Sequence, residues 1–168
     1  LRQHNKPVDT ITLDSMHATI SNGIARNEAG FFFTSCKGVG VSWQMIRDFV
    51  ASLDWKFCRA LGRKSVVAGC FATAREEAWK AAGTFKAGAS ELLLCFPILL
   101  HFAEKVLRLR DLLPDEVASL QSLGCVLHLI ARGKAGHMVA RELTSALALH
   151  GERAKKAYGP ELTKPKNH

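Results

Sequence analysis

The amino-acid sequence predicts a mainly helical domain, a bundle of five to six helices preceded by one short β-strand. Apolar residues recur at intervals of three and four along much of the chain, which is the period of a helix with one buried face. Only residues 8–13, VDTITL, alternate between two faces in the manner of a strand. Because a lone strand has nothing to pair with, we expect its partner strands to lie outside this chain.

The first helix is expected to begin at Asp14 and to extend to about Phe32. The Asp14 carboxylate can accept a hydrogen bond from a backbone N–H two or three residues later, as N-cap residues do. The segment SCKGVG, residues 35–40, contains two glycines and is predicted to be a loop. The predicted apolar face of this first helix holds Ile20, Ile24 and Phe31.

Two further helices are expected before residue 83. Ser42 is a suitable N-cap for the first of them, which has apolar residues at helical spacing up to Leu53. Residues 71–82, FATAREEAWKAA, are rich in alanine and predict the second. Between residues 62 and 88 the periodicity is otherwise weak.

The most apolar stretch, residues 89–103, is expected to form a core helix that is kinked at Pro97. It falls short of the roughly 20 apolar residues that cross a membrane, so we expect no membrane contact. Pro114, followed by two acidic residues, marks the start of the next helix. GKAG, residues 133–136, ends that helix, and a last helix is predicted over residues 137–157.

Positive charge is concentrated in two segments of a chain whose formal net charge is +8. Residues 55–64, WKFCRALGRK, hold four basic residues and no acidic one. Residues 131–168 hold eight basic residues and three acidic ones. This balance favours a polyanionic partner, most often nucleic acid, although basic surfaces also occur for solubility alone. Charge alone leaves both interpretations open; DNA, bound without sequence specificity, is the partner that the first one implies.

The cysteines and histidines indicate no metal centre. The five cysteines are an odd number, are widely spaced and include no C-x-x-C pair, which favours a reducing compartment over a disulfide framework. His17 and His168 would need further ligands to bind zinc, and the other histidines show no recognisable ligand spacing. We expect no cofactor in this chain.

Two short motifs resemble a known family. LDSMH, residues 13–17, followed by SNGIARNEAG, resembles the D-x-x-H signature of eukaryotic DDE-type DNA transposases with an RNase H-like core, and most closely the CACTA (En/Spm-like) group. YGPELTKPKNH, residues 158–168, resembles the Pro-Lys-x-His segment on which those proteins return from a helical insertion to the core. The motif residues in this chain are Asp14, His17, Pro165, Lys166 and His168.

The resemblance implies a division into three parts. Residues 1–33 would be a strand and the D-x-x-H helix at the edge of an RNase H-like sheet, residues 34–159 the helical insertion domain, and residues 160–168 the lead back to the missing core. The family's chemistry needs three carboxylates holding two divalent metal ions, Mg²⁺ or Mn²⁺. The motif match assigns none of the three to this chain, so we expect a fragment without catalysis. The start at Leu1 rather than at a methionine also favours a piece of a longer protein.

Each candidate residue also has a structural interpretation. The Asp14 carboxylate can orient His17 one helical turn later. Trp55 stands among basic residues, as a base-stacking platform requires, yet it can equally pack in a core, where we expect Trp43 and Trp79. Basic residues at the end of the last helix can bind phosphate or stabilise the helix dipole. The candidate nucleic-acid-binding residues are Trp55, Lys56, Arg59, Arg63, Lys64, Arg153, Lys155 and Lys156.

Three functions remain open at this level. The chain is a non-catalytic piece of a transposon-derived protein that contacts DNA through basic helices, a helical module that binds protein partners, or a degenerate remnant without selected activity. The first implies a nuclear location and the remainder of the transposase core as a partner; the others imply only an intracellular one. The salt dependence of DNA binding separates the first from the second.

Overall fold

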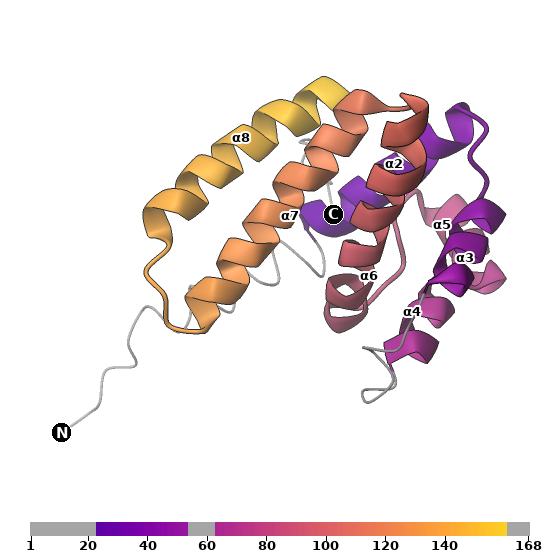
Figure 1. The fold of residues 1–168 in the computed structure, drawn as a ribbon, viewed down its shortest axis with the longest axis horizontal. Helices are drawn as coiled ribbons and strands as arrows, with labels where there is room; N and C mark the ends of the chain where they lie inside the picture. The colour runs from indigo at the N-terminus through magenta and orange to yellow at the C-terminus, as the bar shows by residue number, and fades with distance from the viewer. Residues whose placement is uncertain (1–22, 54–62, 161–168) are drawn as a thin grey trace.

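The computed structural model describes residues 23–53 and 63–160. These residues form seven α-helices and no strand (Figure 1), which confirms the mainly helical fold class. The predicted strand, residues 8–13, lies outside the described residues. The α-helices are α2 (Ile24–Gly38), α3 (Trp43–Ser52), α4 (Arg63–Cys70), α5 (Thr73–Ala82), α6 (Ala89–Phe102), α7 (Pro114–Lys134) and α8 (Ala140–Tyr158).

The helices form two groups on either side of α6. α7 and α8 lie side by side as a helical hairpin on one flank, and α3, α4 and α5 gather on the opposite flank (Figure 1). α6 packs against both α4 and α7, so the most apolar segment of the sequence is central, as predicted. A π-helical turn, η3 (Ala103–Leu107), and a 3-10 turn, η4 (Arg108–Arg110), connect α6 to α7. No helix in the described part of the chain is long and apolar enough to cross a membrane.

The predicted end and the predicted apolar face of the first helix both differ from those of α2. The helix continues through most of the predicted loop at residues 35–40 and ends only at Gly38, where the Val39 N–H bonds back to the last carbonyls. The predicted apolar face is also wrong at Ile24, which is 39% exposed. Three consecutive phenylalanines, residues 31–33, make the register of the buried face ambiguous from sequence alone. The structure buries Ala25, Glu28, Ala29, Phe32, Phe33 and Cys36.

The other helix boundaries follow the sequence signals closely. The Ser42 Oγ accepts a hydrogen bond from the Met45 N–H at 3.2 Å, so the predicted N-cap of α3 is confirmed. α5, α6 and α7 begin within a few residues of their expected starts, and α8 ends just before Gly159. α4 was not predicted, because its eight residues have little periodicity. The expected start of the last helix at residue 137 is also wrong: α8 begins at Ala140.

An aromatic cluster forms the core between α2 and the α3–α5 group. Phe33 lies at its centre, with ring centroids 4.8 Å from Trp43, 5.3 Å from Phe85 and 5.8 Å from Trp79. Both tryptophans are buried, as predicted, and both of their ring N–H groups find partners. The Trp43 Nε1–H donates to the Phe71 carbonyl at 2.8 Å. A buried indole with a satisfied N–H can stabilise the core without an unpaired polar group.

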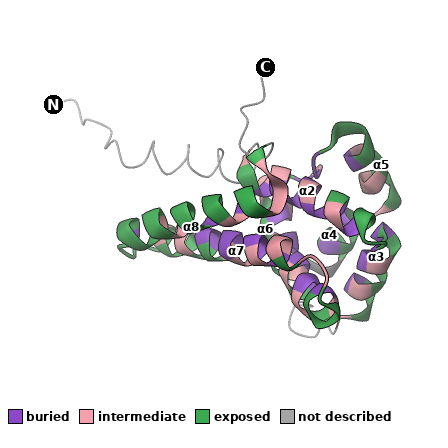
Figure 2. Cartoon of the chain, turned by 90° about the horizontal axis from the view of Figure 1, so that it is seen from above, coloured by how far each residue is buried: buried purple, intermediate pink, exposed green. Residues whose placement is uncertain are grey.

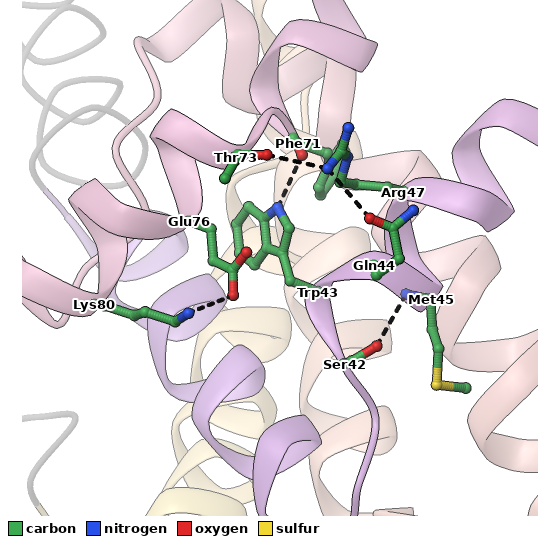
Figure 3. A network of polar contacts seen from close by, with 9 residues as sticks. All are labelled: Ser42, Trp43, Gln44, Met45, Arg47, Phe71, Thr73, Glu76 and Lys80. Carbon is green, nitrogen blue, oxygen red and sulfur yellow. Dashed lines mark hydrogen bonds and ion pairs between the residues drawn. The ribbon is translucent and has the colours of Figure 1, made fainter.

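Polar side chains link α3 to the start of α5 beside this cluster (Figure 3). The Arg47 guanidinium donates to Thr73 Oγ1 at 3.1 Å and to Gln44 Oε1 at 3.2 Å. Lys80 and Glu76 form an ion pair one turn apart on α5, with 2.6 Å between Nζ and Oε1. Exposed contacts of this kind contribute about 1 kcal/mol or less each. The buried Trp43 therefore fixes the position of α3 more strongly than its polar rim does.

α2 and the end of α5 approach each other at Gly30. A Cβ atom at this position would lie 2.7 Å from the Gly83 carbonyl oxygen and 3.0 Å from the Thr84 Cα. The Gly30 carbonyl also accepts a hydrogen bond from the Trp79 Nε1–H at 3.2 Å. The contact is between two backbones, so only glycine fits here.

Candidate nucleic-acid interface

Most of the predicted site residues lie outside the described part of the chain. This holds for both motif sets, Asp14 with His17 and Pro165 with Lys166 and His168. It holds also for Trp55, Lys56 and Arg59. Arg63 and Lys64 form the first turn of α4, where the structure describes the backbone.

The three predicted residues on α8 differ in their surroundings. The half-buried Arg153 donates from Nη1 to the Ala118 carbonyl at 3.4 Å. The Lys156 Nζ lies 2.7 Å from the Asp115 Oδ1 in an exposed ion pair. Lys155 is exposed and has no such contact among the described residues. Two of the three cations thus already have partners on α7, and the charge of Lys156 is partly neutralised by Asp115.

A second basic surface lies at the opposite end of the same hairpin. The far end of α7 and α8 extends away from the α3–α5 group and is largely exposed (Figure 2). We call residues 131–141 the hairpin tip. Between Val117 and Arg141 the chain contains no aspartate or glutamate, and Glu142 is the first acid that follows. The exposed basic side chains of the hairpin tip are Arg132, Lys134 and Arg141, with His137 beside them.

Backbone hydrogen bonds order the hairpin tip. The His137 N–H donates to the Arg132 carbonyl at 3.1 Å, and the Gly136 N–H donates to the Gly133 carbonyl at 3.0 Å. Gly136 has a φ of 88°, so the turn is a Schellman motif with glycine in the left-handed position. The motif occupies residues 135–137, which explains why α8 begins later than predicted. The cationic side chains of Arg132, Lys134 and Arg141 therefore flank a defined turn.

The helix dipoles favour some of the basic residues of the hairpin tip and disfavour another, which distinguishes a structural role from a binding role. Arg132 and Lys134 lie in the last turn of α7, where positive charge is favourable without any ligand. Arg141 lies in the first turn of α8, where positive charge is unfavourable. The Arg141 side chain is exposed and forms no hydrogen bond or ion pair with another described residue. Fold stability gives no reason for an arginine here, whereas an anionic partner does.

Two other features bear on the chemistry of the surface. No group of three histidine, cysteine, aspartate or glutamate side chains that could hold a metal ion occurs in residues 23–53 and 63–160. An apolar groove of about 610 Å³ lies between α6 and α7, lined mainly by Leu93, Phe96, Pro97, Leu100 and Leu127. The lining of this groove suits an apolar face of another polypeptide.

The basic residues of the hairpin tip belong to the basic segment 131–168 but are not among the predicted site residues. The signal that identifies them is the run from Val117 to Arg141 without an acidic residue. Searches among known proteins do not add to this: no family model, curated protein or solved structure matches the chain. The resemblance to transposases therefore depends on the two motifs alone.

Proposed function

We propose that this chain is the helical insertion of a DDE-type transposase-like protein and that it contacts DNA without sequence specificity and without catalysing a reaction. The main support is the hairpin tip, where three exposed cations flank a defined turn and no acidic residue occurs in the sequence between Val117 and Arg141. Phosphate contacts from such side chains supply most of the affinity of non-specific DNA binding. The basic residues at the other end of α8 and at residues 55–64 are the further contacts expected in this proposal.

Neutralising the hairpin tip tests the proposal. We expect the variant carrying Arg132→Gln, Lys134→Gln and Arg141→Gln to bind duplex DNA at least tenfold more weakly at about 0.1 M salt. The slope of log affinity against log salt should become shallower by about 2.7, since each lost phosphate contact removes about 0.9. Fluorescence anisotropy with a labelled duplex over a range of salt concentrations measures both quantities.

A matched control removes the same charge elsewhere. Lys37, Lys80 and Lys105 are exposed and lie on α2, α5 and η3, away from the hairpin tip, so their replacement by glutamine should leave most of the slope intact. Equal losses in the two triple variants would show that net charge alone attracts DNA. An undetectable affinity of the unaltered chain at about 50 mM salt would contradict the proposal itself.

Arg141→Gln separates binding from stability. The substitution removes a positive charge from the positive end of the α8 dipole, so the free energy of unfolding should rise by about 0.3–1 kcal/mol. The same change should weaken DNA binding by one phosphate contact. Urea denaturation and the salt titration measure the two effects in one sample. A loss of stability would indicate that Arg141 has a structural role.

The protein-interaction alternative has one observation in its favour, the apolar groove between α6 and α7. A module of this kind would bind an apolar peptide there, with a weak dependence on salt. The two functions thus predict different salt dependences of binding, steep for DNA and weak for an apolar peptide. The DNA titration therefore decides between them.

A further inference from the structure

Four side chains from three helices form a closed polar ring inside the protein. Glu28 comes from α2, Ser119 and Ser122 from α7, and His150 from α8, and each is at most 3% exposed. Ser119 Oγ lies 2.6 Å from Glu28 Oε1, and Ser122 Oγ lies 2.7 Å from the Ser119 carbonyl oxygen. His150 Nδ1 lies 3.1 Å from Ser122 Oγ, and its Nε2 lies 3.2 Å from Glu28 Oε2.

The direction of these contacts fixes the positions of the protons. The Ser122 hydroxyl has one hydrogen and donates it to the Ser119 carbonyl, so the same oxygen must accept from His150 Nδ1–H. A neutral His150 then has no proton on Nε2, the atom that faces Glu28. Ser119 donates to the other carboxyl oxygen of Glu28. A single proton between Glu28 Oε2 and His150 Nε2 is what completes the ring.

The two atoms that share this proton depend on each other. Glu28 Oε2 and His150 Nε2 are both buried and have no other partner among the described residues, and their contact is not aligned as a regular ring N–H hydrogen bond. Without a proton they are two acceptors at close range. With two protons the pair would carry an uncompensated positive charge in the core. Both the loss of the shared proton and the gain of a second one therefore destabilise the state in which α8 is docked.

The surroundings favour a neutral pair. Burial raises the pKa of Glu28 to about 7, although the hydrogen bond from Ser119 opposes this shift. Burial lowers the pKa of His150, and a hydrogen bond to the Ser119 backbone opposes this shift in turn. Tyr158 on α8 faces Glu28, and the same phenol also lies near Glu116 on α7 and Cys36 on α2. Burial and these neighbours raise the pKa of the Tyr158 phenol, so it stays neutral. The guanidinium of Arg153 on α8 is directed to the Ala118 carbonyl.

We propose that the ring binds one proton and that this proton fastens α8 to α2 and α7. The ring holds His150, one of the two buried residues of α8, the other being Ala154. The partly buried Leu143 and Ala146 also pack against the core. The remaining attachments of α8 include the half-buried rings of Tyr158 and Phe31, 5.9 Å apart, and the exposed Lys156–Asp115 pair. The inference rests on the ring alone and does not depend on DNA binding.

The proton count predicts how docking of α8 responds to pH. When α8 is detached, Glu28 titrates at about 4.5 and His150 at about 6.5, so the pair binds one proton between these values. The docked pair also binds one proton there, and the docking equilibrium should not change with pH in this window. Below 4.5 the detached pair binds a second proton and α8 should open. Above about 6.5 the detached pair binds none, and docking should weaken slightly.

Between pH 4.5 and 6.5, where opening of α8 should not depend on pH in the unaltered chain, two substitutions should make it depend on pH in opposite directions. Glu28→Gln leaves a docked ring without a titrating proton, while the detached His150 still binds one below 6.5. Opening of α8 should therefore increase up to tenfold for each pH unit from 6.5 downward. His150→Gln leaves Glu28, whose pKa is raised in the docked state, so opening should increase up to tenfold for each pH unit from 4.5 upward.

Hydrogen-exchange protection of α8 amides, compared with those of α6, measures opening between pH 4.5 and 6.5 in the 168-residue chain. Glu116→Gln removes a nearby carboxyl outside the ring and should leave the flat profile unchanged. Flat profiles in both ring variants, or slopes of the same sign, would overturn the proposal. If the ring variants do not fold, the ¹³C carboxyl signal of Glu28 and the ¹⁵N ring signals of His150 in the unaltered chain decide. One proton on the pair throughout pH 4.5–6.5 supports the proposal, and two protons or none overturn it.

Discussion

Phe33→Ala is expected to lower the free energy of unfolding by about 3–5 kcal/mol. Phe33 is 2% exposed and lies at the centre of the aromatic cluster, in contact with both buried tryptophans and with Phe85. Removing its ring leaves a cavity among large rigid side chains from three different segments, which have little freedom to fill it. Denaturation by guanidinium chloride, followed by circular dichroism, measures the loss.

Phe31→Ala is the matched control for this substitution. Phe31 belongs to the same run of phenylalanines but is only half-buried, with its ring 5.9 Å from that of Tyr158. We expect less than half of the loss caused by Phe33→Ala, since part of the ring is already in contact with water. A larger loss at Phe31 than at Phe33 would contradict the register of α2 described here.

The second large effect is expected at Gly30, where alanine should destabilise the fold by about 3 kcal/mol. The added Cβ would meet the Gly83 carbonyl oxygen at 2.7 Å, a distance that real Cβ contacts do not reach. Neither side can move easily, because the Gly30 carbonyl holds the Trp79 indole and Gly83 ends α5 in the left-handed conformation. Equilibrium denaturation again measures the change.

Gly151→Ala provides the opposite case. Gly151 is exposed within α8, and an added Cβ would meet no atom within 4 Å. Alanine should therefore stabilise the protein by up to about 1 kcal/mol through its higher helix propensity. If the two glycine substitutions had similar effects, the close approach between α2 and the end of α5 would be disproved.

The sequence predicted the helices whose boundaries carry local signals. The Ser42 N-cap, the Pro114 start and the Gly159 end each act through neighbouring backbone groups, so they can be recognised without the rest of the fold. The register of α2 could not be predicted in this way. Its buried face is selected by partners such as Trp79 and Ser119, which are far away along the chain.

The candidate interface was predictable in its charge but not in its location. Composition revealed an excess of cations after residue 131, and the fold then showed that Arg153 and Lys156 contact α7 while Arg141 remains without a partner on the described surface. Glu28 could not be identified as a buried acid, because its partner His150 is 122 positions later in the sequence. Such pairs become visible only when helices are placed in space.

Met138, next to the Schellman turn, can serve as a natural NMR probe of this surface. Backbone hydrogen bonds maintain the turn, so the Met138 side chain, which is 95% exposed, takes no part in holding it. The sequence has only three methionines, so a ¹³C-methyl spectrum contains few signals and the mobile Met138 methyl should give a narrow one. Any large molecule that settles on this end of the hairpin would broaden that line, which makes association observable without attaching a dye.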